Sequence, residues 1–314
     1  MLRLNLARPI AALAIGASIL VGACGGGSAS PAASGSGPDA DALKVVTTTT
    51  VLADLVGQVG GARVDVVSLV PKGGEVHTFD PTPADVQRVT DAQLIVMNGL
   101  GLDKWLADLV TDAGTSAPLL KLAEDLQGVE LLTGDGEPGE EFNPHLWLNV
   151  AYASKYVDRI QEALTAAAPA DAATFASGAD AYRTRLAELD AFAKSELAKM
   201  PASDRKVVAF HEAFPYFAAA YGLEIVGTIV SAPGQDPSAG ELADLVAAIR
   251  DNGVKAIFAE AQFSDDLVQT IADETGASVV ANLYNDSVGD APADTYEGMM
   301  RWNIARVMEA LAAG

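Results

Sequence analysis

Three histidines and one aspartate are the residues of this chain that are best suited to bind a ligand. His77, His145 and His211 are its only histidines, and Asp286 lies in the loop sequence LYNDSVG. Imidazole nitrogens combined with one carboxylate oxygen are the ligands that a tetrahedral divalent ion of intermediate softness prefers. No two of the four residues have a local metal-binding spacing such as H-E-x-x-H. A metal site therefore requires that the fold bring them together, and three unrelated histidines are the alternative.

The elements that must position these residues follow a regular order. From residue 44 onward, short β-rich runs alternate with helical patterns, which is typical of βαβ units and a parallel sheet. The expected strands cover residues 44–49, 63–70, 93–97, 206–210, 223–230, 255–259 and 278–283. Amphipathic helices are expected over residues 51–59, 102–112, 238–251 and 265–275. In open α/β sheets ligands bind beyond the carboxyl ends of the strands, and His77, His211 and Asp286 each follow such an end.

A long helical region divides the strands into two groups. Residues 151–200 contain no strand pattern, only alanine-rich helix interrupted at Pro169. Beyond the proline, apolar residues recur at the helical spacings of 3, 4 and 7, namely Phe175, Tyr182, Leu186, Leu189 and Phe192. A continuous helix over residues 170–200 would be about 45 Å long, which is long enough to join two lobes.

The two groups of strands also resemble each other. One shift without gaps places Lys44 on Lys206, Gly60 on Gly222 and Val67 on Ile229. The expected fold is therefore α/β with two lobes, each with a mainly parallel sheet flanked by helices. A long rigid helix would join the lobes, and the metal site would lie in the cleft between them.

The N-terminus resembles a bacterial lipoprotein signal peptide. Arg3 and Arg8 precede an apolar run over residues 10–23 that is too short to span a bilayer. The run ends in Val-Gly-Ala before Cys24, the only cysteine. We expect cleavage before Cys24 and acylation of its thiol, which would anchor the protein to the outer face of the cytoplasmic membrane. The alternative is an ordinary signal peptide that happens to contain cysteine.

Composition excludes several classes of partner. The net charge of −22 argues against nucleic acid, whose phosphates would be repelled. With 20 Lys and Arg residues, the chain has too few for a polybasic membrane patch. Half of the residues are hydrophobic, so a substantial core is expected. With Cys24 used by lipid, no thiol remains for a disulfide, and an exported fold must rely on packing.

Six motifs together carry a family resemblance over the whole body of the chain. They are GGEVHTFDPTP, VMNGLGLDKWL, NPHLWLN, VVAFHEAFPYF, FAEAQFS and LYNDSVG. In this order they resemble the metal-binding lipoproteins that act as solute receptors of zinc and manganese ABC importers, in particular the zinc type. The resemblance implies two α/β lobes joined by one long helix, with a single divalent ion in the cleft.

The resemblance also implies the metal ligands, the cargo and the partners of the protein. By motif, the ligands fall on His77, His145, His211 and Asp286. Glu260, which ends an expected strand at the same sheet edge, is a candidate acceptor that would orient a histidine, with an ordinary strand-end carboxylate as the alternative. The cargo would be Zn²⁺, with Mn²⁺ as the alternative, because three imidazoles favour zinc over manganese. The partners would be an ABC permease, its ATPase and the lipid bilayer, and the receptor would be a monomer without enzymatic activity.

Some residues depart from the family pattern. Val76 and Ala261 stand where the family often has proline, and Asn149 replaces an acidic residue. A histidine-rich loop often seen in zinc receptors is absent, and the acidic sequence GDGEPGEE stands in its place. That acidic segment is interpreted as a solvated turn, with weak cation collection as the alternative.

Two other functions are compatible with parts of the sequence. A secreted zinc hydrolase would keep three protein ligands and an open position for water, whereas Asp286 would close the coordination here. A surface adhesin is compatible with the lipid anchor, but only as an added role.

The resulting domain prediction has five parts. They are a signal peptide over residues 1–23, a flexible lipid-anchored tether over 24–42, an N-terminal α/β lobe over 43–169, a linking helix over 170–200 and a C-terminal α/β lobe over 201–314.

Overall fold

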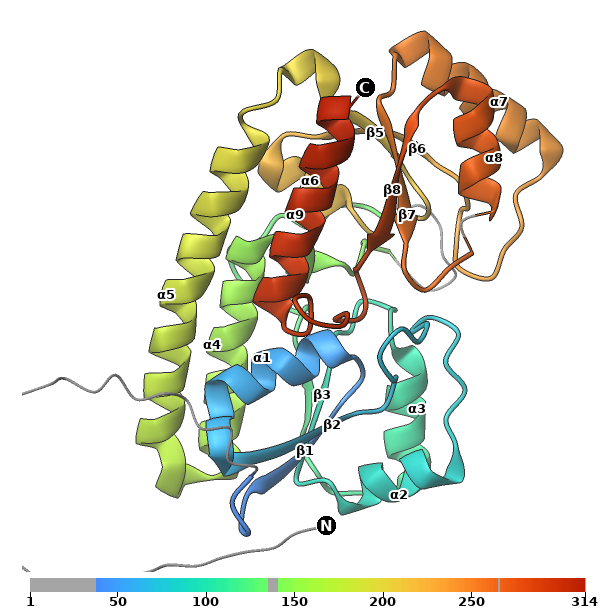
Figure 1. The fold of residues 1–314 in the computed structure, drawn as a ribbon. Helices are drawn as coiled ribbons and strands as arrows, with labels where there is room; N and C mark the ends of the chain where they lie inside the picture. Colours follow the sequence, from blue (N-terminus) through green and yellow to red (C-terminus); the bar gives the residue numbers. More distant parts are fainter. Residues whose placement is uncertain (1–37, 135–140, 265, 314) are drawn as a thin grey trace, which may run out of the picture. The chain divides into compact units, whose positions relative to one another are not determined.

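Each half of the chain builds one four-stranded parallel sheet (Figure 1). The structure is a computed structural model that describes residues 38–134, 141–264 and 266–313. The first sheet contains β1 (Leu43–Thr47), β2 (Val64–Ser68), β3 (Leu94–Met97) and β4 (Leu119–Lys121) in the order β2-β1-β3-β4. The second contains β5 (Lys206–Ala209), β6 (Glu224–Thr228), β7 (Ala256–Glu260) and β8 (Ser278–Leu283) in the order β6-β5-β7-β8. The two halves therefore share one topology, which confirms the predicted two-lobed α/β fold.

Every pair of neighbouring strands in these sheets is parallel. Helices cover both faces of each sheet, so central strands such as β3 (LIVM) and β7 (AIFAE) are buried at every position. That burial explains their continuous apolar sequence, because alternation is expected only where one face meets water. β4 was not expected from the sequence, because three half-buried residues at a sheet edge are too few to show a period.

Nine helices lie in the described part of the chain. They are α1 (Thr50–Gly60), α2 (Pro83–Asp91), α3 (Lys104–Ala113), α4 (Val150–Ala167), α5 (Ala172–Leu197), α6 (Pro215–Tyr221), α7 (Ala239–Asn252), α8 (Asp266–Thr275) and α9 (Tyr296–Ala313). Local signals set several of their ends. Ser238 caps α7 by accepting from the N–H of Glu241, whose carboxylate accepts from Ser238 N, and Gly253 ends the helix in the left-handed region.

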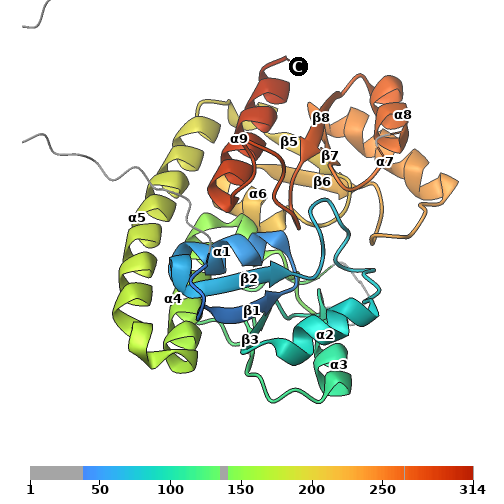
Figure 2. The same ribbon diagram turned by 60° about the horizontal axis from the view of Figure 1, so that its bottom comes forward.

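The predicted linking helix corresponds to α5, which has 26 residues and is therefore about 39 Å long. It runs beside α4 along one side of both sheets (Figures 1 and 2). Four members of the predicted stripe are buried against the core, namely Phe175, Tyr182, Leu186 and Leu189, whereas Phe192 is partly buried. The domain boundaries predicted around this helix stay a prediction.

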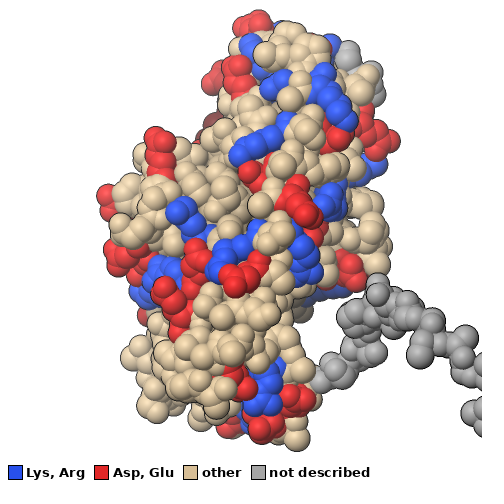
Figure 3. Space-filling view, turned by 90° about the vertical axis from the view of Figure 1, so that its left-hand side faces the viewer, with Lys and Arg blue, Asp and Glu red and all other residues tan. Residues whose placement is uncertain are grey.

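Charged side chains of both signs are interspersed on the side of the molecule where α5 lies (Figure 3). Several form ion pairs within one turn, such as Lys194 with Asp190, or between helices, such as Arg183 with Asp158. Such a mixed surface is typical of a solvated helix face, so α5 offers no single-sign patch to a charged partner.

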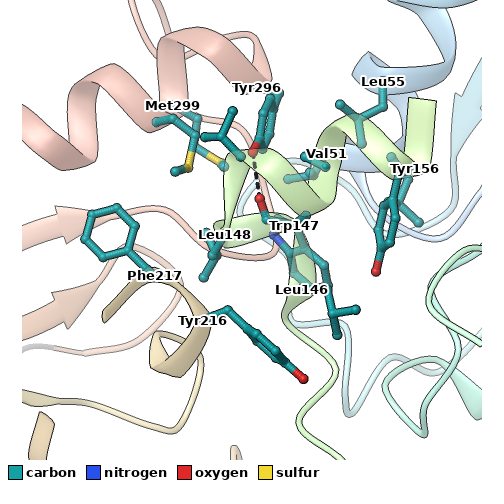
Figure 4. Packing of buried hydrophobic residues seen from close by; sticks show 14 of the residues in the cluster. Val51, Leu55, Leu146, Trp147, Leu148, Tyr156, Tyr216, Phe217, Tyr296 and Met299 are labelled. Atoms are coloured by element: carbon teal, nitrogen blue, oxygen red, sulfur yellow. Dashed lines mark hydrogen bonds between the residues drawn. The ribbon is translucent and has the colours of Figure 1, made fainter. Parts of the chain in front are cut away.

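One hydrophobic core joins the two halves. The 3-10 turn Leu146–Leu148 inserts between residues of the first half, such as Val51 and Leu55, and residues of the second half, such as Phe217 and Met299 (Figure 4). The hydroxyl of Tyr296 donates to Trp147 O over 2.6 Å within this core. Two smaller clusters lie on the outer faces, under α2 and α3 for the first sheet and under α7 and α8 for the second.

An ion-pair cluster holds the start of the described chain. Arg63, just before β2, binds Asp39 and Asp41 at the beginning of the chain and Asp171 ahead of α5. Hydrogen bonds to Asp171 and Asp39 raise the pKa of Arg63 above its ordinary value. This cluster lies at the edge of the first sheet where the strands begin.

The predicted signal peptide, Cys24 and the tether up to residue 37 lie outside the described residues, as do residues 135–140 of the acidic segment. Within the described ranges, no helix combines the length and the apolar character that crossing a bilayer requires.

Candidate metal centre

Loops after the strands bring three of the predicted ligands together, and the segment before the turn Leu146–Leu148 adds the fourth. His77 lies between β2 and α2, and His145 immediately precedes the turn Leu146–Leu148. His211 follows β5, and Asp286 follows β8. One ligand atom from each residue lies within 4.8 Å of the others. Two side chains come from each half of the chain, so this group of side chains lies where the two halves meet.

The side chains face one another in a buried space. The ring centroids of the three histidines are 5.4 to 5.6 Å apart. Asp286 Oδ1 lies 3.7 Å from His145 Nε2, and Asp286 Oδ2 lies 4.0 Å from His77 Nε2. Ligand atoms around a tetrahedral zinc ion lie about 3.3 Å apart, given bonds of about 2.0 Å. A small inward movement would therefore bring this arrangement to metal-binding distances.

The side-chain amide of Asn143 fixes the ring of His145. Its Oδ1 lies 3.1 Å from His145 Nδ1 and accepts from His145 N over 3.0 Å. The amide cannot turn around, because its Nδ2 donates to Glu212 O over 2.6 Å. An acceptor at Nδ1 selects the tautomer with the proton there. Nε2, which is buried and has no hydrogen bond within the described residues, is thus left to bind a cation.

Glu260 fixes the ring of His211 in the same way. Its carboxylate oxygens lie 2.9 and 2.8 Å from His211 Nδ1, and Oε1 also accepts from His211 N over 3.2 Å. This is the geometry expected for an acceptor that orients a histidine. Further donors come from Gln262 and Asn285, both to Oε2. His211 Nε2 points away from this carboxylate and has no hydrogen bond within the described part of the chain.

Backbone contacts hold the loop that carries His77. Gly73 has φ +72°, which glycine adopts without strain, and its N–H donates to Ser287 Oγ over 2.8 Å. The indole N–H of Trp105 donates to Val76 O over 2.9 Å. Glu75 Oε1 accepts from His77 N over 2.7 Å. Val76, one of the departures from the family pattern, is fully buried and anchors the loop by packing.

A buried polar cluster supports the loop before His145. Asn98 follows β3, and its Nδ2 donates to Pro144 O over 2.9 Å while Tyr156 donates to its Oδ1 over 2.7 Å. Asp103 accepts from the backbone N–H groups of Asn98 and of the next residue. These contacts give the VMNGLGLDKWL motif a structural role that the sequence analysis did not identify.

Burial and neighbouring charges shift the proton affinities of the site in opposite directions. Burial, aided by His211 and His77, lowers the pKa of His145 well below its ordinary value. Burial acts on His211 in the same direction, but the Glu260 and Asp286 carboxylates together outweigh it and raise the pKa of His211. Burial raises the pKa of Asp286 to about 7, although the histidines oppose this shift. Near neutral pH, a metal ion must therefore displace protons from the side chains of His211 and Asp286.

The family of the chain follows from its sequence as a whole. A family model described as ZnuA, zinc-uptake complex component A periplasmic, matches residues 45–310. The chain belongs to this family. ZnuA-family proteins are substrate-binding receptors of ABC importers and not enzymes, so the secreted zinc hydrolase considered from the sequence was wrong.

Named relatives bind different metals. The manganese-binding lipoprotein MntA of Halalkalibacterium halodurans is 29% identical over 280 residues, which cover 88% of this chain and 91% of MntA. The manganese ABC transporter substrate-binding lipoprotein PsaA of Streptococcus pneumoniae is 30% identical over 315 residues, covering 95% of this chain and 97% of PsaA. The solved structure of the periplasmic zinc-binding protein TroA from Treponema pallidum has a TM-score of 0.78 and 28% identity, covering 86% of this chain and 99% of TroA.

The Mn-bound periplasmic metal-binding protein from Candidatus Liberibacter asiaticus has the same fold. Its TM-score is 0.77 at 25% identity, and the match covers 86% of this chain and 99% of that protein. ZnuA-family membership is thus compatible with either metal, and the choice between them depends on the site itself.

Proposed function

We propose that this protein is an extracytoplasmic receptor that captures Zn²⁺ and delivers it to an ABC importer. The ion would be held by His77, His145, His211 and Asp286. The observation that carries the proposal is the convergence of these four side chains, each at most 5% exposed, from two separate sheets. A buried group of three imidazoles and one carboxylate has little reason to assemble without a cation to bind.

The donor set supports zinc as the cargo. Three nitrogens and one oxygen match the four-coordinate sites that zinc prefers, and zinc stands above manganese in affinity for such ligands. Manganese is the second candidate, because MntA and PsaA are named as manganese-binding proteins. In cells, availability of the metal also contributes to selection.

The direct test is elemental analysis of protein purified without added metal. We expect one zinc per chain, and competition on metal-stripped protein should show tighter binding of Zn²⁺ than of Mn²⁺. Co-purification with manganese and a preference for it would contradict zinc as the cargo. Binding of neither ion would contradict the receptor function itself.

The location of the receptor is part of the proposal. Cys24, with the apolar run before it, supports a lipid anchor that keeps the folded body at the outer face of the cytoplasmic membrane. The body would work there as a monomer beside its permease and ATPase. Cys24→Ser should release the protein from the membrane fraction, and a variant that still fractionates with membranes in detergent-free extracts would contradict the anchor.

A further inference from the structure

Asn285 lies directly before Asp286 and contacts both carboxylates of the site. Its side chain is fully buried. Its Nδ2 lies 3.0 Å from Glu260 Oε2 and 3.3 Å from Asp286 Oδ2. Its backbone oxygen accepts from Trp147 Nε1 over 2.9 Å, which ties this segment to the first half of the chain. Asn285 is thus positioned by contacts on several sides.

Gln262 determines which way the Asn285 amide points. Gln262 Nε2 donates to Asn285 Oδ1 over 2.6 Å and to Glu260 Oε2 over 3.3 Å. Turning the Asn285 amide around would place its oxygen against two carboxylates and its NH₂ against another NH₂. The orientation with Nδ2 toward the carboxylates is therefore the only one that the surrounding groups satisfy.

The two oxygens of Asp286 differ because of this amide. Both lie near an imidazole, Oδ1 at 3.7 Å from His145 Nε2 and Oδ2 at 4.0 Å from His77 Nε2. Oδ2 accepts from Asn285, whereas Oδ1 is buried and has no hydrogen bond within the described ranges. One oxygen is thus partly engaged and the other is available to a cation.

We propose that Asn285 is a positioning residue that makes Asp286 a one-oxygen ligand and thereby favours zinc over manganese. This inference rests on the proposed function of the site. Three imidazole nitrogens and one carboxylate oxygen give four donors, which suits tetrahedral zinc. Without the amide, both oxygens of Asp286 can bind the ion, and five donors with a larger oxygen share suit manganese better.

The test replaces Asn285 by leucine, which keeps the branched shape of the side chain and removes the donor. Metal-stripped Asn285→Leu protein is titrated with Zn²⁺ and Mn²⁺ in competition, and its coordination number is read from the visible spectrum of bound Co²⁺ and from X-ray absorption of bound Zn²⁺. We expect the ratio of zinc to manganese affinity to fall about 10-fold or more, the range seen when partners of ligands are lost. The spectra should change from four-coordinate to five-coordinate.

Asn303→Leu is the matched control. Asn303 is equally buried and bonds both backbone groups of Tyr284, close to the same segment, but the structure records no carboxylate contact for it among the described residues. Its loss should lower the stability of the protein without changing the ratio of zinc to manganese affinity or the Co²⁺ spectrum. If the ratio of zinc to manganese affinity falls as much in Asn303→Leu as in Asn285→Leu, the change reflects a general destabilisation of the segment, and the inference is overturned.

Gln262→Leu keeps the inference testable if Asn285→Leu does not fold. Gln262 is only partly buried. Its loss removes the donor that holds Asn285 Oδ1 and so fixes the Asn285 amide less firmly beside Asp286, and a shift of about threefold in the same direction is expected. A folded Gln262→Leu or Asn285→Leu protein with an unchanged ratio and four-coordinate spectra would overturn the inference but leave the receptor function standing. Wild-type protein that binds neither metal would instead overturn the proposed function, and this inference with it.

Discussion

The two halves of the molecule share a sheet topology but support their ligands differently. In the second half, a side-chain network surrounds the ligands, and Glu260 and Asn285 contact His211 and Asp286 directly. In the first half, Asn143 orients His145 in a similar way, but the loop that carries His77 is held mainly through backbone atoms, as by the Trp105 indole on Val76 O. Topology thus brings ligands to a common edge, whereas the side chains around them decide their charge and rigidity. The second half should govern protonation and metal choice, and the first half the closing of the site.

The largest expected effect comes from removing the second half's charged ligand. Asp286→Asn should lower zinc affinity by more than about 100-fold, which exceeds typical losses for groups that only support a ligand. The same change should stabilise the metal-free protein. Because burial raises the pKa of Asp286 to about 7 in the folded state, stability is lost as pH rises from about 4 through 7.

Thermal and denaturant unfolding in EDTA at pH 8 and pH 5 checks this prediction. We expect Asp286→Asn to gain roughly 2–4 kcal/mol at pH 8 and less at pH 5, since one pKa unit corresponds to about 1.4 kcal/mol. Asp54→Asn is the control, because the partly buried Asp54 also has a raised pKa but bonds Gln58 and Tyr296 N. It should leave zinc affinity unchanged. No gain in stability for Asp286→Asn would contradict a costly buried charge.

A second prediction concerns the other ligand of the second half. His211→Glu replaces a nitrogen donor by an oxygen donor and should lower the ratio of zinc to manganese affinity by about 10-fold or more. Competition titrations on metal-stripped protein measure this ratio. If the ratio stays at the wild-type value, His211 does not bind the ion.

The pH dependence of binding sharpens the comparison further. Glu260 and Asp286 raise the pKa of His211, and burial raises that of Asp286 to about 7, so zinc affinity should fall as pH drops from 8 to 6. His145, whose pKa is lowered, should contribute little over this range. Glu260→Gln removes the charge that raises the pKa of His211, so its zinc affinity should fall less steeply with pH. Equal slopes for both proteins in titrations at several pH values would argue against this role of Glu260.

A milder effect is expected from the first half. Trp105→Phe removes the indole N–H that holds the loop before His77 and should weaken zinc binding about three- to 10-fold, with a loss of about 1 kcal/mol in stability. Trp302→Phe makes the same chemical change in the second half, where the indole donates to Asn282 O away from the site. Calorimetric titration of both variants should show weaker binding only in Trp105→Phe. Equal losses of zinc affinity in the two variants would contradict a role of the Trp105 contact in positioning the loop.

The smallest effect should be the change in overall dimensions on binding. One core spans both halves, and α5 runs beside them, so zinc should produce local closure of the loops and no wide hinge motion. Small-angle scattering should give nearly equal radii of gyration with and without zinc. The melting temperature should nevertheless rise, because zinc at a thousandfold excess over its dissociation constant adds about 4 kcal/mol to the free energy of unfolding. A large compaction would contradict a rigid connection between the halves.

The sequence was most informative where burial imposed a pattern. The strand predicted over residues 255–259 corresponds within one residue to β7 (Ala256–Glu260), which is buried at every position. The strand over residues 278–283 has the predicted bounds. The edge strand β4 was missed because three residues carry no period. For the site, parallel topology predicted that His77, His211 and Asp286 would meet at strand ends, and the structure does bring them together. Their binding of metal stays a prediction.

The groups that orient the ligands could not be predicted in the same way. Asn143 and Asn285 are each close to a ligand in sequence, but whether a short amide side chain faces a neighbouring ring or solvent depends on rotamers and on partners far along the chain. Gln262 reaches the site only because β7 and β8 are neighbours, whereas Glu260 was a candidate because it ends a strand at the same sheet edge. Such contacts are consequences of tertiary packing, which periodicity does not encode.

The Arg63 cluster has a practical consequence for how this protein can be handled. Arg63 binds Asp39, Asp41 and Asp171 where the strands of the first sheet begin, and the ligands lie where the strands end. The described chain therefore begins on the side of the body opposite the ligands. A purification tag, a fluorescent label or a sensor surface attached through that end should leave the metal site accessible. A mechanical force applied at that end would break the ion pairs around Arg63 before it disturbed the site.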